Sequence, residues 1–219
     1  MGGNNIPSDQ WKLRGGTAWV YPANGAAQVV DPVIVVAEPG PGPTDLGAFA
    51  DRVDGPDYPL RTKLAQRGKD VILVGYDDKS DWDSAEQVIE EAALRTRAMR
   101  YGTKPLAVVG AGRAALLTRY ALARLEDKQM AHEVAAFFSL DSTTPTAAEQ
   151  DALSTVGAMP QLPRLGKITS AGTRDLEGLG PRDDPDSSQF DDALYASGPA
   201  SKTSLVNEEE GNWLLARLP

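Results

Sequence analysis

The amino-acid sequence predicts an α/β fold built on a mostly parallel β-sheet with helices on both faces. Segments with helical patterning separate four apolar runs rich in Val, Ile and Leu, at residues 33–37, 71–74, 106–109 and 134–140. Uninterrupted apolar runs that alternate with helices are typical of parallel strands buried on both faces of a sheet. Ahead of them, residues 17–21 and 26–30 flank an Asn-Gly pair, which predicts an antiparallel N-terminal hairpin.

Most of the chain is expected to form one domain, because 219 residues suit a single hydrophobic core. Residues 1–16 are polar and contain several Gly and Asn residues, so we expect a flexible N-terminus followed by the domain at 17–219. From about 145 to 200, prolines interrupt short apolar pieces, and we expect a lid-like excursion over the sheet. The chain is expected to re-enter the sheet at 203–206.

Two helices are predicted between the apolar runs. The first begins near Ser84, where Ser84 and Gln87 have the spacing of a capping box, and it ends before Gly102. The second covers residues 114–127, and its apolar side is expected to face the sheet while Arg119 faces outward.

Composition excludes several kinds of chemistry. The chain has no cysteine and one histidine, so it can form neither a disulfide, a thiolate nucleophile nor a multi-histidine metal site, and we expect no metal and no cofactor. The formal net charge of −9, without a Lys/Arg cluster, makes nucleic acid and membrane surfaces poor partners. No secretory signal pattern is present at the N-terminus, so a cytoplasmic location is expected.

The most specific local pattern is the segment 106–120, LAVVGAGRAALLTRY, in which an apolar strand turns through small residues into a helix. A nucleophile elbow, G-x-S-x-G, has this arrangement. Gly110 and Ala114 stand at its two glycine positions, and Gly112 stands at its serine position. Glycine tolerates the strained backbone of such a turn, so the geometry can persist without the nucleophile. A tight strand-to-helix turn, or a loose phosphate-binding loop, is the alternative interpretation.

The order of several segments resembles the lipase and esterase branch of the α/β hydrolases that includes the GPI inositol-deacylases. The likeness covers roughly residues 32–210. Its segments are Glu38 after a buried strand, GKDVI at 68–72, Asp81-Trp82 at a helix start, LLTRYAL at 116–122 and SLDS at 139–142. The resemblance implies the α/β-hydrolase fold, with a truncated C-terminal part because no strand and helix are expected after residue 218.

The departures from that family fall on its catalytic parts. Its nucleophilic serine corresponds to Gly112, and its Pro-His after the Asp-Ser pair corresponds to Thr143-Thr144. The oxyanion loop is EPGPGP at 38–43, in which the prolines have no N–H to donate. His132 precedes the strand at 134–140 and is expected at the end of the sheet opposite the elbow. The resemblance therefore implies a scaffold without the serine-hydrolase machinery.

A ligand pocket is expected where the carboxyl ends of the parallel strands meet. Its candidate catalytic residues are Asp141 and Glu38, the acids placed to act on a ligand. Its candidate ligand-binding residues are Gly40, Gly42, Ala111, Gly112 and Arg113, with Met159, Leu162 and Leu165 as a roof. Asp141 has an alternative role, as a cap on the amides of residues 142–144, and Arg113 is expected to pair with a carboxylate such as that of Asp141, or with an anionic ligand. Glu208, Glu209 and Glu210 are expected to form a solvated face.

Three functions remain open. The first is a non-hydrolytic protein that binds a small, largely apolar organic ligand, with cyclase, isomerase or lyase chemistry carried by a carboxyl group. The second is a non-catalytic binding or scaffolding protein that keeps the fold alone. The third is a hydrolase with an unusual nucleophile, such as Asp141.

The sheet is expected to end in an uncovered edge strand, whose unpaired N–H and C=O groups invite pairing with another chain. We therefore predict a homodimer, or a partner that covers this edge. Light scattering over a range of protein concentrations tests this. A monomer at every accessible concentration, with no partner in pull-down experiments, would contradict it.

Overall fold

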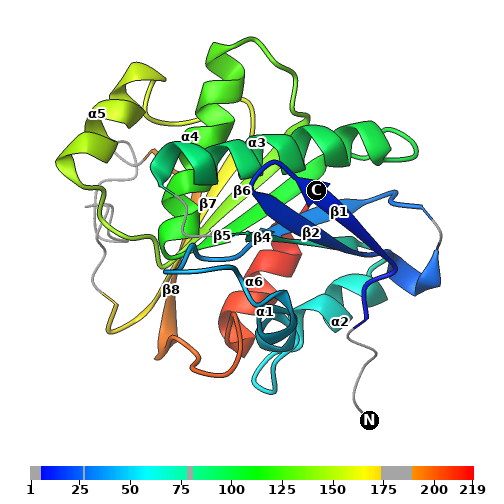
Figure 1. Ribbon diagram of the computed structural model, residues 1–219. Helices are drawn as coiled ribbons and strands as arrows, with labels where there is room; N and C mark the ends of the chain where they lie inside the picture. Colours follow the sequence, from blue (N-terminus) through cyan, green and yellow to red (C-terminus); the bar gives the residue numbers. More distant parts are fainter. Residues whose placement is uncertain (1–5, 27, 78–80, 174–188) are drawn as a thin grey trace.

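A computed structural model describes residues 6–26, 28–77, 81–173 and 189–219, and its strands form one sheet in the order β1-β2-β4-β3-β5-β6-β7-β8 (Figure 1). The strands are β1 (Asp9–Leu13), β2 (Gly16–Tyr21), β3 (Pro32–Val36), β4 (Asp70–Tyr76), β5 (Leu106–Ala111), β6 (Val134–Leu140), β7 (Arg164–Ala171) and β8 (Asp192–Pro199). The helices are α1 (Leu46–Val53), α2 (Leu60–Gln66), α3 (Trp82–Met99), α4 (Arg113–Asp127), α5 (Ala147–Thr155) and α6 (Glu208–Arg217), with a 3₁₀ turn at Ala23–Gly25.

The four predicted apolar strands are confirmed as β3, β4, β5 and β6. From β4 through β3 to β8, each strand pairs in parallel with its neighbour, whereas the β1–β2 and β2–β4 pairs are antiparallel. The alternation of side chains across the sheet divides the core into two apolar layers. Helices α3 and α4 cover one layer, and α1, α2 and α6 cover the other (Figure 1). The mostly parallel α/β architecture is the one predicted.

The antiparallel hairpin is present, but it lies earlier in the chain than expected. It is formed by β1 and β2, and Gly15 at their turn has a φ of 86°. Residues 9–13 therefore do not belong to a flexible N-terminus, because Trp11 and Leu13 are buried on alternate positions of β1. The Asn-Gly pair instead ends the 3₁₀ turn.

The segment 145–200 is not an excursion in its described part, and the sheet does not end early. It contributes α5, β7 and β8, and β8 pairs along β7, so the expected truncation of the C-terminal part is wrong. The strand expected at 203–206 is absent, and these residues lead into α6. Residues 174–188 lie outside the described residues. Strand β8 is the outer strand on this side, and the homodimer stays a prediction.

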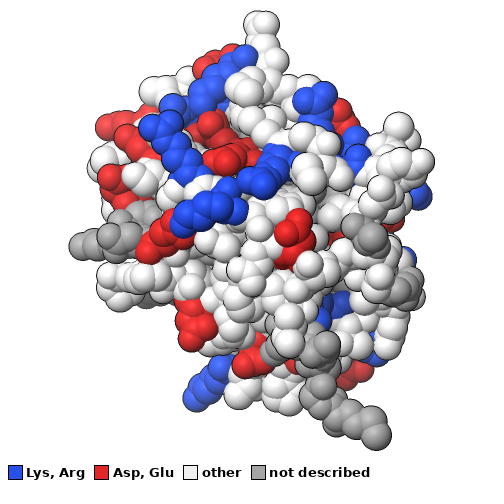
Figure 2. Space-filling view, turned by 45° about the vertical axis from the view of Figure 1, so that its right-hand side comes forward, with Lys and Arg blue, Asp and Glu red and all other residues white. Residues whose placement is uncertain are grey.

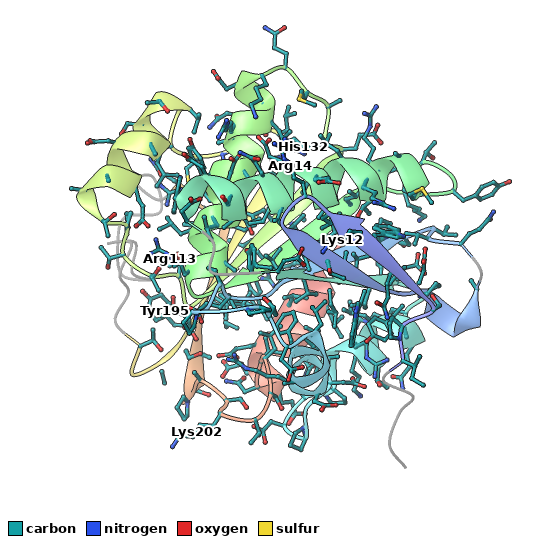
Figure 3. The ribbon with its side chains drawn as sticks, in the orientation of Figure 1. Lys12, Arg14, Arg113, His132, Tyr195 and Lys202 are labelled. Atoms are coloured by element: carbon teal, nitrogen blue, oxygen red, sulfur yellow. The ribbon has the colours of Figure 1, made fainter. Side chains whose placement is uncertain are left out.

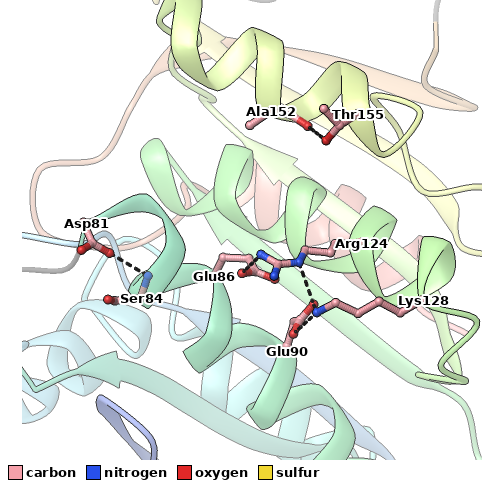
Figure 4. Close-up of polar contacts among 8 residues, drawn as sticks. All are labelled: Asp81, Ser84, Glu86, Glu90, Arg124, Lys128, Ala152 and Thr155. Carbon is pink, nitrogen blue, oxygen red and sulfur yellow. Dashed lines mark hydrogen bonds and ion pairs between the residues drawn. The ribbon is translucent and has the colours of Figure 1, made fainter.

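Contacts between acidic and basic side chains join α3 to α4. Arg124 donates to the buried carboxyl group of Glu86 at 2.7 Å, and Lys128 pairs with Glu90 at 2.8 Å (Figure 4). Blue and red atoms accordingly lie next to each other over the upper part of the face in Figure 2. Arg119, expected to face outward, is buried and donates from Nε to the carbonyl of Ala158 at 2.6 Å. Among the described residues no helix is both long and apolar enough to cross a bilayer.

Glu86 supplies a test of the α3–α4 packing. Burial, together with the neighbouring Glu90, raises the pKa of the Glu86 carboxyl to about 8, although Arg124 and Lys128 oppose the shift. The folded state then holds a proton that the unfolded chain releases at lower pH, so the free energy of unfolding falls as pH rises from about 4.5 to about 8.

The side chain of Glu86→Gln resembles protonated Glu86. We predict that the loss of unfolding free energy between pH 5 and pH 8 is more than about 1 kcal/mol smaller in this variant than in the wild type. Urea unfolding at pH 5 and pH 8 measures it. The exposed Glu208→Gln variant serves as the control and should keep the wild-type difference. Equal differences in the wild type and Glu86→Gln would contradict the prediction.

Candidate functional site

A sharp turn at Gly112 joins β5 to α4, as the elbow pattern predicts. Gly112 has φ 55° and ψ −127°, a backbone conformation that side-chain-bearing residues rarely adopt, and its N–H donates to the carbonyl of Leu140 at 2.8 Å. At Gly110, an added Cβ would lie 2.8 Å from the carbonyl oxygen of Ala114. The strand and the helix can therefore approach this closely because both positions are glycine.

The carboxylate of Glu38 occupies the space beside the elbow. Its Oε1 accepts a hydrogen bond from the backbone N–H of Arg113 at 3.1 Å, and a Cβ built on Gly112 would lie 2.7 Å from the same oxygen. In a nucleophile elbow, the N–H that follows the nucleophile forms one half of the oxyanion hole. The carboxylate of Glu38 thus lies where a side chain at position 112 would begin, and it already accepts a hydrogen bond from the N–H of Arg113.

The side chain of Arg113 turns away from this space. Its guanidinium pairs with Glu149 of α5 and lies 5.9 Å from the ring centroid of Trp82. Glu149 is buried and forms a capping box with Thr146 at the start of α5. Arg113 therefore has the carboxylate partner that was expected, but this partner is Glu149 and not Asp141, and the ion pair joins α5 to α4.

A cavity of about 840 Å³ opens at the carboxyl ends of β3, β5 and β6. The structure brings six of the predicted site residues to its wall: Glu38, Gly40, Gly42, Ala111, Gly112 and Asp141. The predicted roof is wrong. Met159 and Leu165 are buried in the apolar layer under α3 and α4, and Leu162 is 70% exposed.

The opposite wall of the cavity comes from α1 and from residues 200–205. Phe49 and Arg52 of α1 line it, together with Leu205. Sequence reasoning missed α1, although Leu46, Ala50 and Val53 have the spacing of one apolar helix face and are all buried. That spacing was the signal that could have found this wall.

Asp141 lines the cavity, and its carboxylate binds Ser170 of the neighbouring strand β7. Its φ of 44° is unusual for a residue with a side chain. Its Oδ1 accepts from the N–H of Ser170 at 2.8 Å, and its Oδ2 contacts the Ser170 hydroxyl at 2.7 Å. The expected cap on residues 142–144 is therefore wrong, because the carboxylate binds across the sheet to β7.

Ser170 connects Asp141 to a second carboxyl group. Its hydroxyl oxygen lies 2.6 Å from Oε1 of Glu210, which is 2% exposed and therefore not part of a solvated face. The Ser170 hydroxyl donates to Glu210 and also lies within hydrogen-bond distance of Asp141, so one hydroxyl links two carboxyl groups. Burial, the largest cause, raises the pKa of Glu210, and the charge of Asp141 adds to this.

His132 has no part in this site. Figure 3 places it in the upper part of the molecule, away from Arg113 at the elbow. Its side chain is fully buried, its Nδ1 accepts from the N–H of Val134 at 3.0 Å, and its Nε2 lies 3.2 Å from a carboxylate oxygen of Glu126. These contacts fix a structural histidine at the amino end of β6. Within the described ranges, no group of three or more His, Asp and Glu residues could hold a metal ion.

Comparison with known proteins agrees with this architecture. No family model and no curated protein matches the sequence. Among solved structures, the chain is similar to an esterase from Rhizomucor miehei, with a TM-score of 0.61, 14% identity, and coverage of 97% of this chain and 84% of that one. It is equally similar to an α/β serine hydrolase without a lid from Xanthomonas campestris, with a TM-score of 0.61, 17% identity, and coverage of 97% and 92%.

An esterase from Pyrobaculum calidifontis matches with a TM-score of 0.58 and 15% identity, over 95% of this chain and 82% of that one. At these identities the likeness establishes the fold alone. The chain therefore has the α/β-hydrolase fold.

The Ser170 contacts generate a stability prediction. Ser170→Ala removes the hydroxyl that contacts both the buried Glu210 and Asp141, so we expect the free energy of unfolding to fall by about 1–3 kcal/mol. Ser197→Ala is the matched control, because Ser197 also binds a glutamate of α6, Glu209, at 2.7 Å but on the surface. We expect it to cost less than about 0.5 kcal/mol. Equal losses in the two variants, measured by denaturant unfolding, would contradict the prediction.

Proposed function

We propose that this chain binds a small organic ligand in the cavity at the carboxyl edge of the sheet and does not hydrolyse it by a serine mechanism. The observation that carries the proposal is the position of Glu38. Its carboxylate lies beside Gly112, where a nucleophile would project, and it takes up the N–H that an oxyanion would need. A cavity of this size suits a small organic molecule.

Glu38 is also the acid with the greatest freedom to act on a ligand. Asp141 is held by two contacts to Ser170, and Asp45 accepts from the N–H of Ala48 as the cap of α1. The second oxygen of Glu38 forms no hydrogen bond or ion pair among the described residues. A positioned carboxylate can take or give a proton, so cyclisation, isomerisation or elimination is the chemistry that this site supports.

A hydrolase with an unusual nucleophile is the second candidate, because the solved structures with the same fold are named as esterases or a serine hydrolase. Asp141 is poorly suited to that role, since both of its oxygens are engaged by Ser170. A non-catalytic binding or scaffolding protein is the remaining candidate, and it requires no chemistry at the cavity.

We predict that the purified chain does not turn over p-nitrophenyl acetate above the buffer rate, and that Gly112→Ser gains no esterase activity. The new hydroxyl would lack a positioned base and would face the Glu38 carboxylate. Its strained φ should also lower the free energy of unfolding by about 1–3 kcal/mol. Turnover that survives purification to homogeneity and is lost in Asp141→Asn would support the second candidate instead.

Ligand binding itself is tested by titrating the ¹⁵N-labelled chain with a library of small organic fragments. We expect at least one fragment to shift the amide signals of Gly40, Gly42, Ala111 and Gly112, which line the cavity. If none of the library moves these signals, the binding proposal fails and the scaffold reading stands.

A further inference from the structure

The geometry points to a monocationic amine with an apolar body as the ligand of this cavity, an inference that rests on the proposed function. It begins from the charges on the wall. Three acidic residues, Glu38, Asp45 and Asp141, and one basic residue, Arg52, line the cavity. Both oxygens of Asp141 contact Ser170, and Asp45 caps α1 through the N–H of Ala48. Glu38 lies beside the elbow and caps no helix, so it is the acid that we assign to the ligand.

Glu38 has an incomplete set of partners. In the described part of the chain it forms no ion pair, and its single hydrogen bond is the 3.1 Å contact with the N–H of Arg113. Asp70 provides a comparison, because its carboxylate accepts from the N–H groups of Ala23, Val30 and Asp31 at 2.7, 2.5 and 2.7 Å. Asp70 is buried and fully partnered within the protein, whereas Glu38 is exposed at the cavity, where a cationic ligand can donate to it.

The chemistry of the wall defines the rest of the ligand. Pro41, Pro43 and Phe49 present apolar surface beside Glu38, and they suit a hydrocarbon or aromatic body. Thr143 also lines the cavity, and its hydroxyl oxygen is buried without a hydrogen-bond partner among the described residues. This hydroxyl can accept a second N–H from an ammonium group.

Arg52 limits the charge of the ligand. Arg52 lines the same wall and carries a positive charge, so a second positive charge on the ligand would be repelled. A primary amine with one positive charge therefore fits better than a diamine. It also fits better than a carboxylate, which would meet Glu38.

Three probes of one shape test this inference: 2-phenylethylamine, which is cationic at pH 7, neutral 2-phenylethanol and anionic phenylacetate. Each is titrated into the full chain at low salt, and the dissociation constant is read from the amide shifts of Ala111 and Gly112. We expect the amine to bind about fivefold or more tightly than the alcohol, since the ion pair is partly exposed to solvent. Phenylacetate should bind more weakly than both.

The variant Glu38→Gln should reduce the preference for the amine to less than about twofold, while Glu208→Gln, the exposed control outside the cavity wall, should keep it. Circular dichroism and thermal unfolding confirm that both variants fold. Binding of the alcohol or of phenylacetate as tightly as the amine overturns the amine inference and leaves the proposed function intact. Absence of binding by all three also overturns it, and the fragment titration then decides the proposed function separately.

Discussion

The close approach of β5 to α4 through Gly112 is the constraint on which the site depends. A backbone with φ 55° and ψ −127° at this point directs the N–H of Arg113 toward the end of β3, where Glu38 follows the strand. The same turn leaves no side chain at position 112, and the carboxylate of Glu38 fills part of that space. The elbow thus presents an acid from the neighbouring strand in the place from which a nucleophile would project.

The remaining parts of the site follow from the parallel sheet. Because the carboxyl ends of β3, β5 and β6 meet at one edge, Glu38, Ala111 and Asp141 reach one cavity although they lie far apart in sequence. Behind that edge, Ser170 of β7 contacts both Glu210 and Asp141 and so holds the carboxylate of Asp141 in place. The buried network therefore restrains one acid while the other stays free to meet a ligand.

The central strands of the sheet and the floor of the cavity could be predicted from the sequence, because these parts carry strong local patterns. The strands β3 to β6 are continuous apolar runs, and the glycines of the elbow mark the turn. Strand β7 was missed because Lys167, Thr169 and Ser170 are polar yet buried, and strand β8 because it is half-exposed. The sequence of β8, DALYASGP, ends in Ser, Gly and Pro, which are typical of loops.

The side walls of the site were less predictable, because they depend on tertiary contacts. The pairing of Arg113 with Glu149 requires α5 to pack beside the elbow helix, and the local sequence around Arg113 does not reveal it. In the same way, Glu210 lies in a run of three acids that looks solvent-exposed, yet it is buried because its partner Ser170 comes from the adjoining strand. Burial of a polar group by a distant partner leaves no periodic signal.

The central claim is that the carboxylate of Glu38 accepts a hydrogen bond from the N–H of Arg113 and so takes the place of an oxyanion. A pH titration of the ¹⁵N-labelled chain, followed by NMR, tests it directly. As the Glu38 carboxylate gains its proton, the hydrogen bond weakens, so the amide proton signal of Arg113 should move along the same titration curve as the Glu38 side-chain carbon, and this movement should vanish in Glu38→Gln. An Arg113 amide signal that does not follow Glu38, or that follows it equally in the variant, would contradict the account.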